Sequence, residues 1–297
     1  MNSFDAHLPA LTTEQADHLR ELVRRHHARR GDSVTVSGDT VHADQGTRAL
    51  YNLAELCRRA EPEAWPRIVE HHFDALDNGT RSAGAGAEDI LRNVYLRLVP
   101  DDAIPAEAAA SFGYTRPVAT GLLEALALDL PDSLRLLDDR DVARVGLEEL
   151  RSAGRARLVG EPVDHDVVRT DSGATVHLVT GGSMFVASKA LVLGDLARTL
   201  TGRELPDDGA LFTAPSRHFL VFHPLEDQYA VGAVNDLGSF GLGAYQDNPG
   251  PLSPRIYWWH KGAVTCLTGI DDATKSFSVV PPDELMTILR RLKGAAS

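Results

Sequence analysis

Apolar residues recur at helical spacing in the first part of the chain. The clearest segment has them at positions i, i+3, i+4 and i+7, which is the spacing of one helix face. These positions are Leu50, Leu53, Ala54 and Cys57. Thr12 and Gln15 have the spacing of a capping box at the start of an earlier helix, and Gly31 is expected to end it. The pattern predicts a helical N-terminal region over residues 1–78.

Beyond residue 90 the periodicity changes to alternation, which is typical of strands. Residues 94–99 are expected to form a strand with one buried face, and residues 122–130 place leucines on one face and small alanines on the other. Further strands are expected at residues 163–169, 175–179, 211–214, 218–223 and 256–260. The predicted fold class is therefore α+β, with a helical N-terminal part followed by a mixed, largely antiparallel sheet flanked by helices.

One segment between these regions has the composition of a linker. It runs from Asp77 to Glu88, reads DNGTRSAGAGAE, and is rich in glycine, alanine and serine. We place the domain boundary in this segment. The division is a helical N-terminal region over residues 1–78 and an α+β domain over residues 90–297.

Glycines mark expected ends and turns in the C-terminal domain. A helix that starts near Asp227 is expected to end in a glycine series at positions 238, 241 and 243. Residues 138–150 are expected to form one helix with an acidic start. Lys261-Gly262 is expected to form the turn of a hairpin.

The charge balance favours some partners over others. The chain has 30 Lys and Arg residues against 42 Asp and Glu residues, which gives a net charge of −12. This balance opposes binding to nucleic acid and to anionic membranes, and it favours a protein partner with a basic surface. The chain shows no secretory signal and no apolar run long enough to span a bilayer, so we expect a soluble cytoplasmic protein.

The cysteines and histidines give no sign of a metal site or of a cofactor. Cys57 and Cys266 are far apart and neither belongs to a CxxC unit, so buried free thiols are expected. A metal site from some of His177, His218, His223 and His260 is the weakest hypothesis, because no pair of them has the spacing of metal ligands. We expect neither a metal nor a cofactor.

The segment ALFTAPSRHFLVFHPLED, residues 210–227, concentrates the candidate chemistry. Pro215 is expected to interrupt a strand there. Alternation places His218 and His223 on opposite faces of the next strand, so they cannot share one metal or one substrate. Asp227 has the position of a helix N-cap, and with His223 it is also the candidate catalytic pair.

Other candidate binding residues lie outside this segment. Ser183 follows a glycine turn, where it can cap a helix or help to bind an anion, although the glycine spacing matches no nucleotide-binding motif. Tyr257, Trp258 and Trp259 form an aromatic run on a strand, and alternation is expected to expose one indole to a partner. Arg217 is the candidate for holding an anionic group.

Three short motifs carry a resemblance to a known family. They read LALDLPDSLRLLDD, GGSMFVAS and APSRHFLVFHPLED. With the elements between them they resemble the YtpQ-like family of uncharacterised bacterial proteins, as a distant actinobacterial-type relative. The resemblance covers about the C-terminal two thirds of the chain. It implies a single-chain α+β protein, and it carries over no catalytic residue, because the family has no settled activity.

Two hypotheses for function compete. The first is a non-catalytic binding or protein-interaction module, of which an immunity protein against a basic toxin is the sharper version. The second is a hydrolase-like enzyme in which His223 acts as general base, Asp227 orients it and Arg217 holds an anionic group, with Ser183 as nucleophile or anion-binding cap. The enzyme hypothesis requires His223 and Asp227 to lie within hydrogen-bonding distance at the floor of a pocket.

Overall fold

The chain folds into two compact units in the computed structural model. The structure describes residues 4–294 apart from 6, 9, 44–45, 82–85, 131–132, 249 and 272–275. One unit comprises Met1–Ala85 and Leu130–Leu134, and the other comprises Gly86–Asp129 and Arg135–Ser297. The first division therefore falls within the segment that has linker composition, but Asp77–Arg81 continue a helix instead of forming a loop.

The N-terminal unit combines helices with a small antiparallel sheet of order β1-β2-β3. Its elements are α1 (Thr13–Arg30), β1 (Val34–Ser37), β2 (Thr40–Ala43), β3 (Gly46–Ala49), α2 (Tyr51–Arg58), the 3₁₀ helix η1 (Pro62–Ala64) and α3 (Trp65–Arg81). The capping box of Thr12 and Gln15 is confirmed, and Gly31 ends α1 in a left-handed conformation with φ of 78°. The apolar stripe of α2 is buried, as its spacing predicts.

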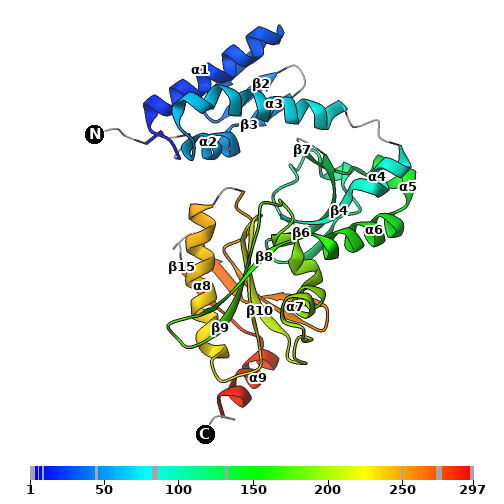
Figure 1. Ribbon diagram of the computed structural model, residues 1–297, viewed down its shortest axis with the longest axis vertical. Helices are drawn as coiled ribbons and strands as arrows, with labels where there is room; N and C mark the ends of the chain where they lie inside the picture. Colours follow the sequence, from blue (N-terminus) through cyan, green and yellow to red (C-terminus); the bar gives the residue numbers. More distant parts are fainter. Residues whose placement is uncertain are drawn as a thin grey trace. The chain divides into compact units, whose positions relative to one another are not determined.

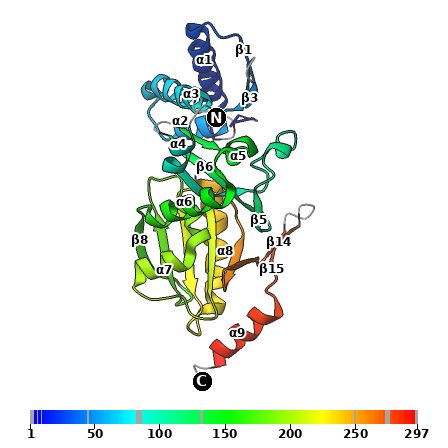
Figure 2. The ribbon, with the colours of Figure 1, turned by 90° about the vertical axis from the view of Figure 1, so that its right-hand side faces the viewer.

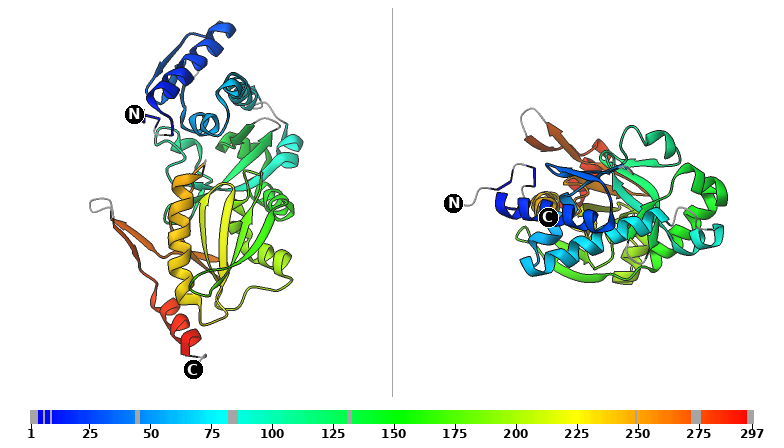
Figure 3. Two further views of the ribbon diagram at one scale, coloured as in Figure 1. Left: turned by 60° about the vertical axis from the view of Figure 1, so that its left-hand side comes forward. Right: turned by 90° about the horizontal axis from the view of Figure 1, so that it is seen from above.

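The second unit is built on a six-stranded antiparallel sheet of order β13-β12-β10-β11-β9-β8 and a four-stranded sheet in which β6 pairs with β4, β5 and β7 (Figure 1). Its strands are β4 (Val94–Pro100), β5 (Arg116–Ala119), β6 (Leu122–Leu130), β7 (Ser133–Leu136), β8 (Asp164–Arg169), β9 (Thr175–Thr180), β10 (Ala210–Ser216), β11 (Phe219–Pro224), β12 (Ile256–His260) and β13 (Ala263–Cys266). Of these, Leu130 of β6 and Ser133 and Leu134 of β7 are counted in the first unit. A separate hairpin of β14 (Thr268–Asp271) and β15 (Ser276–Val279) extends away from the large sheet (Figure 3). The α+β class and the largely antiparallel pairing are confirmed.

Helices cover both faces of the six-stranded sheet. The helices of this unit are α4 (Ala87–Asn93), η3 (Ala109–Ser111), α5 (Asp139–Val145), α6 (Leu147–Gly160), η4 (Ala187–Val192), α7 (Leu193–Thr201), α8 (Ala230–Asp247) and α9 (Asp283–Gly294). Residues of α8 and α9 pack with Leu211 and Val221 on one face, and residues of η4 and α7 pack with Phe212 and Phe222 on the other (Figures 1 and 2). The alternation predicted along β11 therefore divides two hydrophobic cores.

The predicted end of the helix after Asp227 is wrong, because α8 runs through the whole glycine series to Asp247. A Cβ atom on Gly241 would lie 2.6 Å from Thr213 Oγ1, and one on Gly232 would lie 2.4 Å from Ser172 Oγ. These glycines let the helix approach its neighbours closely instead of ending it.

Three further expectations differ from the structure. Residues 138–150 do not form one helix, because Gly146 with φ of 111° separates α5 from α6. Residues 94–99 bury both faces, since Tyr95 and Val99 are buried as well as the leucines. Pro215 lies within β10 at a shift of register instead of ending the strand. Within the described residues no helix has the length and apolar character to cross a membrane.

Candidate functional site

Two segments far apart in sequence meet at the start of β11. The loop of residues 181–186 precedes η4, and its Ser183 carbonyl accepts a hydrogen bond from His218 Nδ1 at 3.0 Å. His218 Nε2 accepts a hydrogen bond from Arg217 Nε at 3.1 Å. Because a carbonyl only accepts, Nδ1 carries the proton and the imidazole is neutral. Both ring nitrogens of His218 are therefore occupied.

Arg97 on β4 reaches the same loop. Its Nη1 donates to the carbonyl of Met184 at 3.4 Å, and its guanidinium lies over the Phe185 ring at 5.6 Å from the centroid. The backbone of β4 is held there by a hydrogen bond from Leu98 N to Ser188 Oγ at 3.0 Å. Adjacent carbonyls of one loop thus hold Arg97 and His218 near each other. We name Arg97, Arg217 and His218 the arginine cluster.

Charge compensation of the arginine cluster is incomplete in the part of the chain that the structure describes. Among the described residues, no Asp or Glu lies within salt-bridge distance of Arg97 or Arg217. Burial and the charge of Arg217 lower the pKa of Arg97 to about 10, and burial lowers the pKa of Arg217. Burial, followed by the charge of Arg217, lowers the pKa of His218. The shifts of the two arginines express positive charges that are poorly solvated, and the charge of Asp129 offsets only part of the shift of Arg97.

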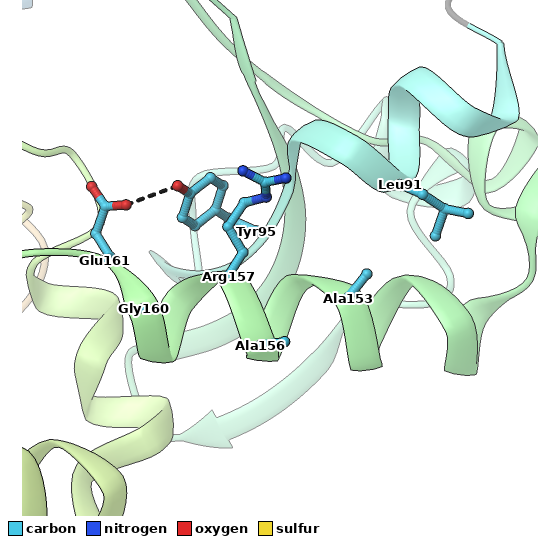
Figure 4. Close-up of a pocket in the computed structure, with 7 residues that line it drawn as sticks. All are labelled: Leu91, Tyr95, Ala153, Ala156, Arg157, Gly160 and Glu161. Atoms are coloured by element: carbon cyan, nitrogen blue, oxygen red, sulfur yellow. Dashed lines mark hydrogen bonds between the residues drawn. The ribbon is translucent and has the colours of Figure 1, made fainter.

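An aromatic row extends from the arginine cluster to a hollow on the same unit. Tyr95 stacks on Phe185 with ring centroids 4.1 Å apart. The guanidinium of Arg157 lies over the Tyr95 ring, 5.5 Å from its centroid. The Tyr95 hydroxyl donates to Glu161 Oε2 at 2.8 Å (Figure 4). The hollow has a volume of about 410 Å³, and small residues of α6 line one side of it (Figure 4). Burial and the Glu161 carboxylate raise the pKa of Tyr95 to about 12.

No family model, curated protein or solved structure matches the chain. The resemblance to the YtpQ-like family therefore stays a prediction. The candidate site has to be judged from its own geometry.

His223 and Asp227 do not have the geometry that the hydrolase hypothesis requires. His223 Nε2 lies 4.0 Å from Asp227 Oδ1, beyond hydrogen-bonding distance. His223 is 1% exposed, and its Nδ1 donates to the Thr175 carbonyl at 2.8 Å. Asp227 Oδ1 accepts from the backbone N–H of Tyr229 at 2.9 Å, just before α8. The histidine is enclosed and the aspartate organises the turn before the helix.

The aromatic run of β12 is buried at two of its three residues. Tyr257 is buried, and its hydroxyl bonds to Ser253 Oγ at 2.7 Å and to the Thr120 carbonyl at 3.1 Å. Trp258 is buried and donates to the Asp208 carbonyl at 2.9 Å. Trp259 is partly buried against the core on the η4 side. Trp258 is therefore the core indole, and Trp259 keeps part of its surface exposed, so the expectation of a partner-binding indole stays a prediction.

Ser183 caps a turn instead of a helix. Its Oγ accepts a hydrogen bond from Phe185 N at 3.2 Å, while the first helical residue of the following segment is Ala187. The part of the chain that the structure describes holds no group of three or more His, Cys, Asp or Glu side chains arranged for a metal ion. Of the predicted binding residues, the structure brings together Ser183, Arg217 and His218.

Arg97 is the member of the arginine cluster that the sequence did not reveal. It alternates with apolar residues on β4, and an arginine in that pattern is most simply interpreted as solvent-exposed. Arg97 pairs across the strands with Ala125, one of the small residues of β6, but this register is visible only in the structure. A small partner leaves space beside a long polar side chain.

Proposed function

We propose that the protein is a cytoplasmic, non-catalytic binding module that holds an anionic group at the arginine cluster. The observation that carries this proposal is the pair of partly buried guanidinium groups, Arg97 and Arg217, without a carboxylate in salt-bridge distance in the described residues. The chain has 42 acidic residues against 30 basic ones, so a shortage of acids does not account for the unpaired state. The two free thiols, Cys57 and Cys266, fit a reducing compartment.

The remaining hydrogen-bond donors of the cluster support an oxygen anion as ligand. A guanidinium group carries several N–H donors in a planar fork, and such forks bind carboxylates and phosphates with two parallel hydrogen bonds. Arg97 and Arg217 each use one donor on the hydrogen bonds described above. A bound anion would engage the other donors and remove the repulsion between the two cations.

The arrangement of the histidines supports binding without catalysis. A general base needs a free nitrogen lone pair within reach of a substrate proton. The Nε2 lone pair of His218 accepts from Arg217, and His223 is enclosed. The hydrolase alternative therefore finds no base at the arginine cluster.

Calorimetric titration with inorganic phosphate and, separately, with succinate at low ionic strength tests the proposal. The two titrations distinguish a phosphate site from a carboxylate site. We expect wild-type protein to bind one of them, and we expect Arg97→Gln and Arg217→Gln each to weaken that binding at least about tenfold, as is typical for loss of a charge-assisted hydrogen bond.

Arg140→Gln is the matched control, because it removes an exposed arginine of α5 from the same unit. Equal heats for wild type, both cluster variants and the control would contradict the proposal. So would an absence of heat from wild-type protein with both anions.

A further inference from the structure

The strand β8 is an uncovered edge of the six-stranded sheet. β8 lies at the margin of its unit in the ribbon (Figure 2). It has β9 as its single neighbour in the sheet, and it pairs with β9 over six consecutive positions from Asp164 to Arg169 without a bulge. The other edge strand, β13, contacts β5. An edge strand presents unpaired N–H and C=O groups along its outer side. These groups make β8 a template for another extended segment.

The side chains of β8 do little to block such pairing. Val167 is 58% exposed and Val168 is 42% exposed, and the strand contains no proline or lysine. Natural edge strands are usually protected by bulges, prolines, lysines or a covering element. Exposed valines favour strand pairing, because β-branched side chains pack well against the pleated surface.

The charge of β8 is acidic and uncompensated. Asp164 and Asp166 are exposed on one face of the strand, and Asp171 follows in the turn to β9. In the described residues none of these three aspartates lies within salt-bridge distance of a basic side chain. Arg169 lies over the ring of Tyr229 at 5.8 Å from its centroid. Asp164 and Asp166 therefore offer two carboxylates on one face of the edge strand, and Arg169 ends the strand on the other face.

We propose that β8 docks an extended, basic segment of a partner protein as a seventh strand of the sheet. Lysine or arginine at alternate positions of the segment pairs across the strands with Asp164 and Asp166. The positions between them are apolar or β-branched and pack beside Val167 on the other face. Backbone hydrogen bonds give affinity and the alternating side chains give selectivity, as in other cases of strand addition.

Charge favours a basic partner segment over the β8 strand of a second copy of the chain. Two β8 strands paired with each other would bring two sets of Asp164 and Asp166 to one interface, and like charges across strands are destabilising. The proposal is independent of the arginine cluster, which uses none of the residues of β8. The net charge of −12 favours a basic protein partner, and β8 is the proposed place where such a partner binds.

Hydrogen exchange of the full chain with a short synthetic peptide tests the proposal. The probe alternates lysine with valine or threonine, and the comparison peptide carries glutamate in place of lysine. We expect the lysine peptide to slow exchange in residues 164–169 and the glutamate peptide to leave it unchanged. The double variant Asp164→Asn and Asp166→Asn should weaken peptide binding about tenfold, since both cross-strand charge pairs are lost.

Two controls make the result specific. Asp102→Asn removes an exposed carboxylate of the same unit and should leave peptide binding unchanged, as should Arg217→Gln. Unprotected amides in residues 164–169 with the lysine peptide would overturn the proposal, and so would equal protection by both peptides. Protection of β8 without peptide, together with a two-chain species in sedimentation, would replace the partner by a second copy and overturn it as well.

Discussion

The two faces of the sheet formed by β4 and β6 differ in how their charged side chains are compensated. Glu124 pairs across the strands with Leu98, and Arg97 pairs with Ala125, so the two charged residues point to opposite faces. On one face Glu124, whose side chain is 3% exposed, meets Arg116 Nη2 at 2.6 Å and Arg151 Nε at 3.3 Å. On the other face Arg97 has the positive Arg217 for a neighbour, and Asp129 acts on it through its charge without a salt bridge among the described residues.

This difference distinguishes a charge that is paired within the fold from a charge that is available to bind a ligand. Burial of a charge is costly unless a partner of opposite sign and hydrogen bonds compensate it. Glu124 has such partners and needs nothing from solution. Among the described residues Arg97 and Arg217 make no such ion pair, and Asp129 offsets only part of the charge of Arg97. In the proposed function an anion from solution supplies the missing contact. The comparison is the physical basis of the proposed function.

Removal of the compensated charge should have the largest effect on stability. Glu124→Gln removes the negative charge that Arg116 and Arg151 share, and loss of one partner of a buried ion pair costs about 3 kcal/mol in the free energy of unfolding. Urea denaturation measures this loss. Glu148→Gln is the matched control, because Glu148 contacts the same Arg151 at 3.5 Å from an exposed position and should change stability by less than about 0.5 kcal/mol. Equal effects of the two substitutions would show that Glu124 is not a compensated structural charge.

A smaller effect is expected on the titration of His218. Burial and the nearby Arg217 charge lower its pKa, so removal of that charge in Arg217→Gln should raise the pKa toward the ordinary value of 6.5. Because the folded-state pKa lies below the unfolded value, the unfolded chain binds the proton more readily, and stability falls as the pH drops through 6.5. The Arg217→Gln variant should lose less stability over this range.

The His218 ring signals in an NMR titration measure this shift directly. Arg116→Gln, on the compensated face, should leave the His218 pKa unchanged. An unchanged His218 pKa in Arg217→Gln would contradict the electrostatic link between the two residues. A shift in both Arg217→Gln and Arg116→Gln would show that the effect is not specific to Arg217.

The sequence predicted correctly those features that depend only on neighbouring residues. The capping box at Thr12, the turn at Lys261-Gly262, where both residues have positive φ, and the opposite faces of β11 follow from short segments. The prediction that the glycine series ends α8 failed because Gly241 serves a contact between distant segments. It leaves space for the side chain of Thr213. Alternation along β12 could not tell whether both faces of the strand are covered.

The candidate site was partly predictable for the same reason. Arg217, His218 and Ser183 stood out by residue type, but their convergence depends on the pairing of distant strands. Arg97 could not be assigned to them, because nothing in residues 94–99 indicates that their edge lies beside the loop of residues 181–186.

Thermal unfolding with increasing phosphate or succinate at constant ionic strength tests the uncompensated cluster most directly. A ligand that binds the folded state stabilises it by about 2.7 kcal/mol at a concentration 100 times its dissociation constant. We predict that one of the two anions raises the unfolding midpoint of the wild type and not that of Arg97→Met, and that the variant is at least as stable as the wild type without anion. Equal rises for both proteins, or none for the wild type with either anion, would contradict the account.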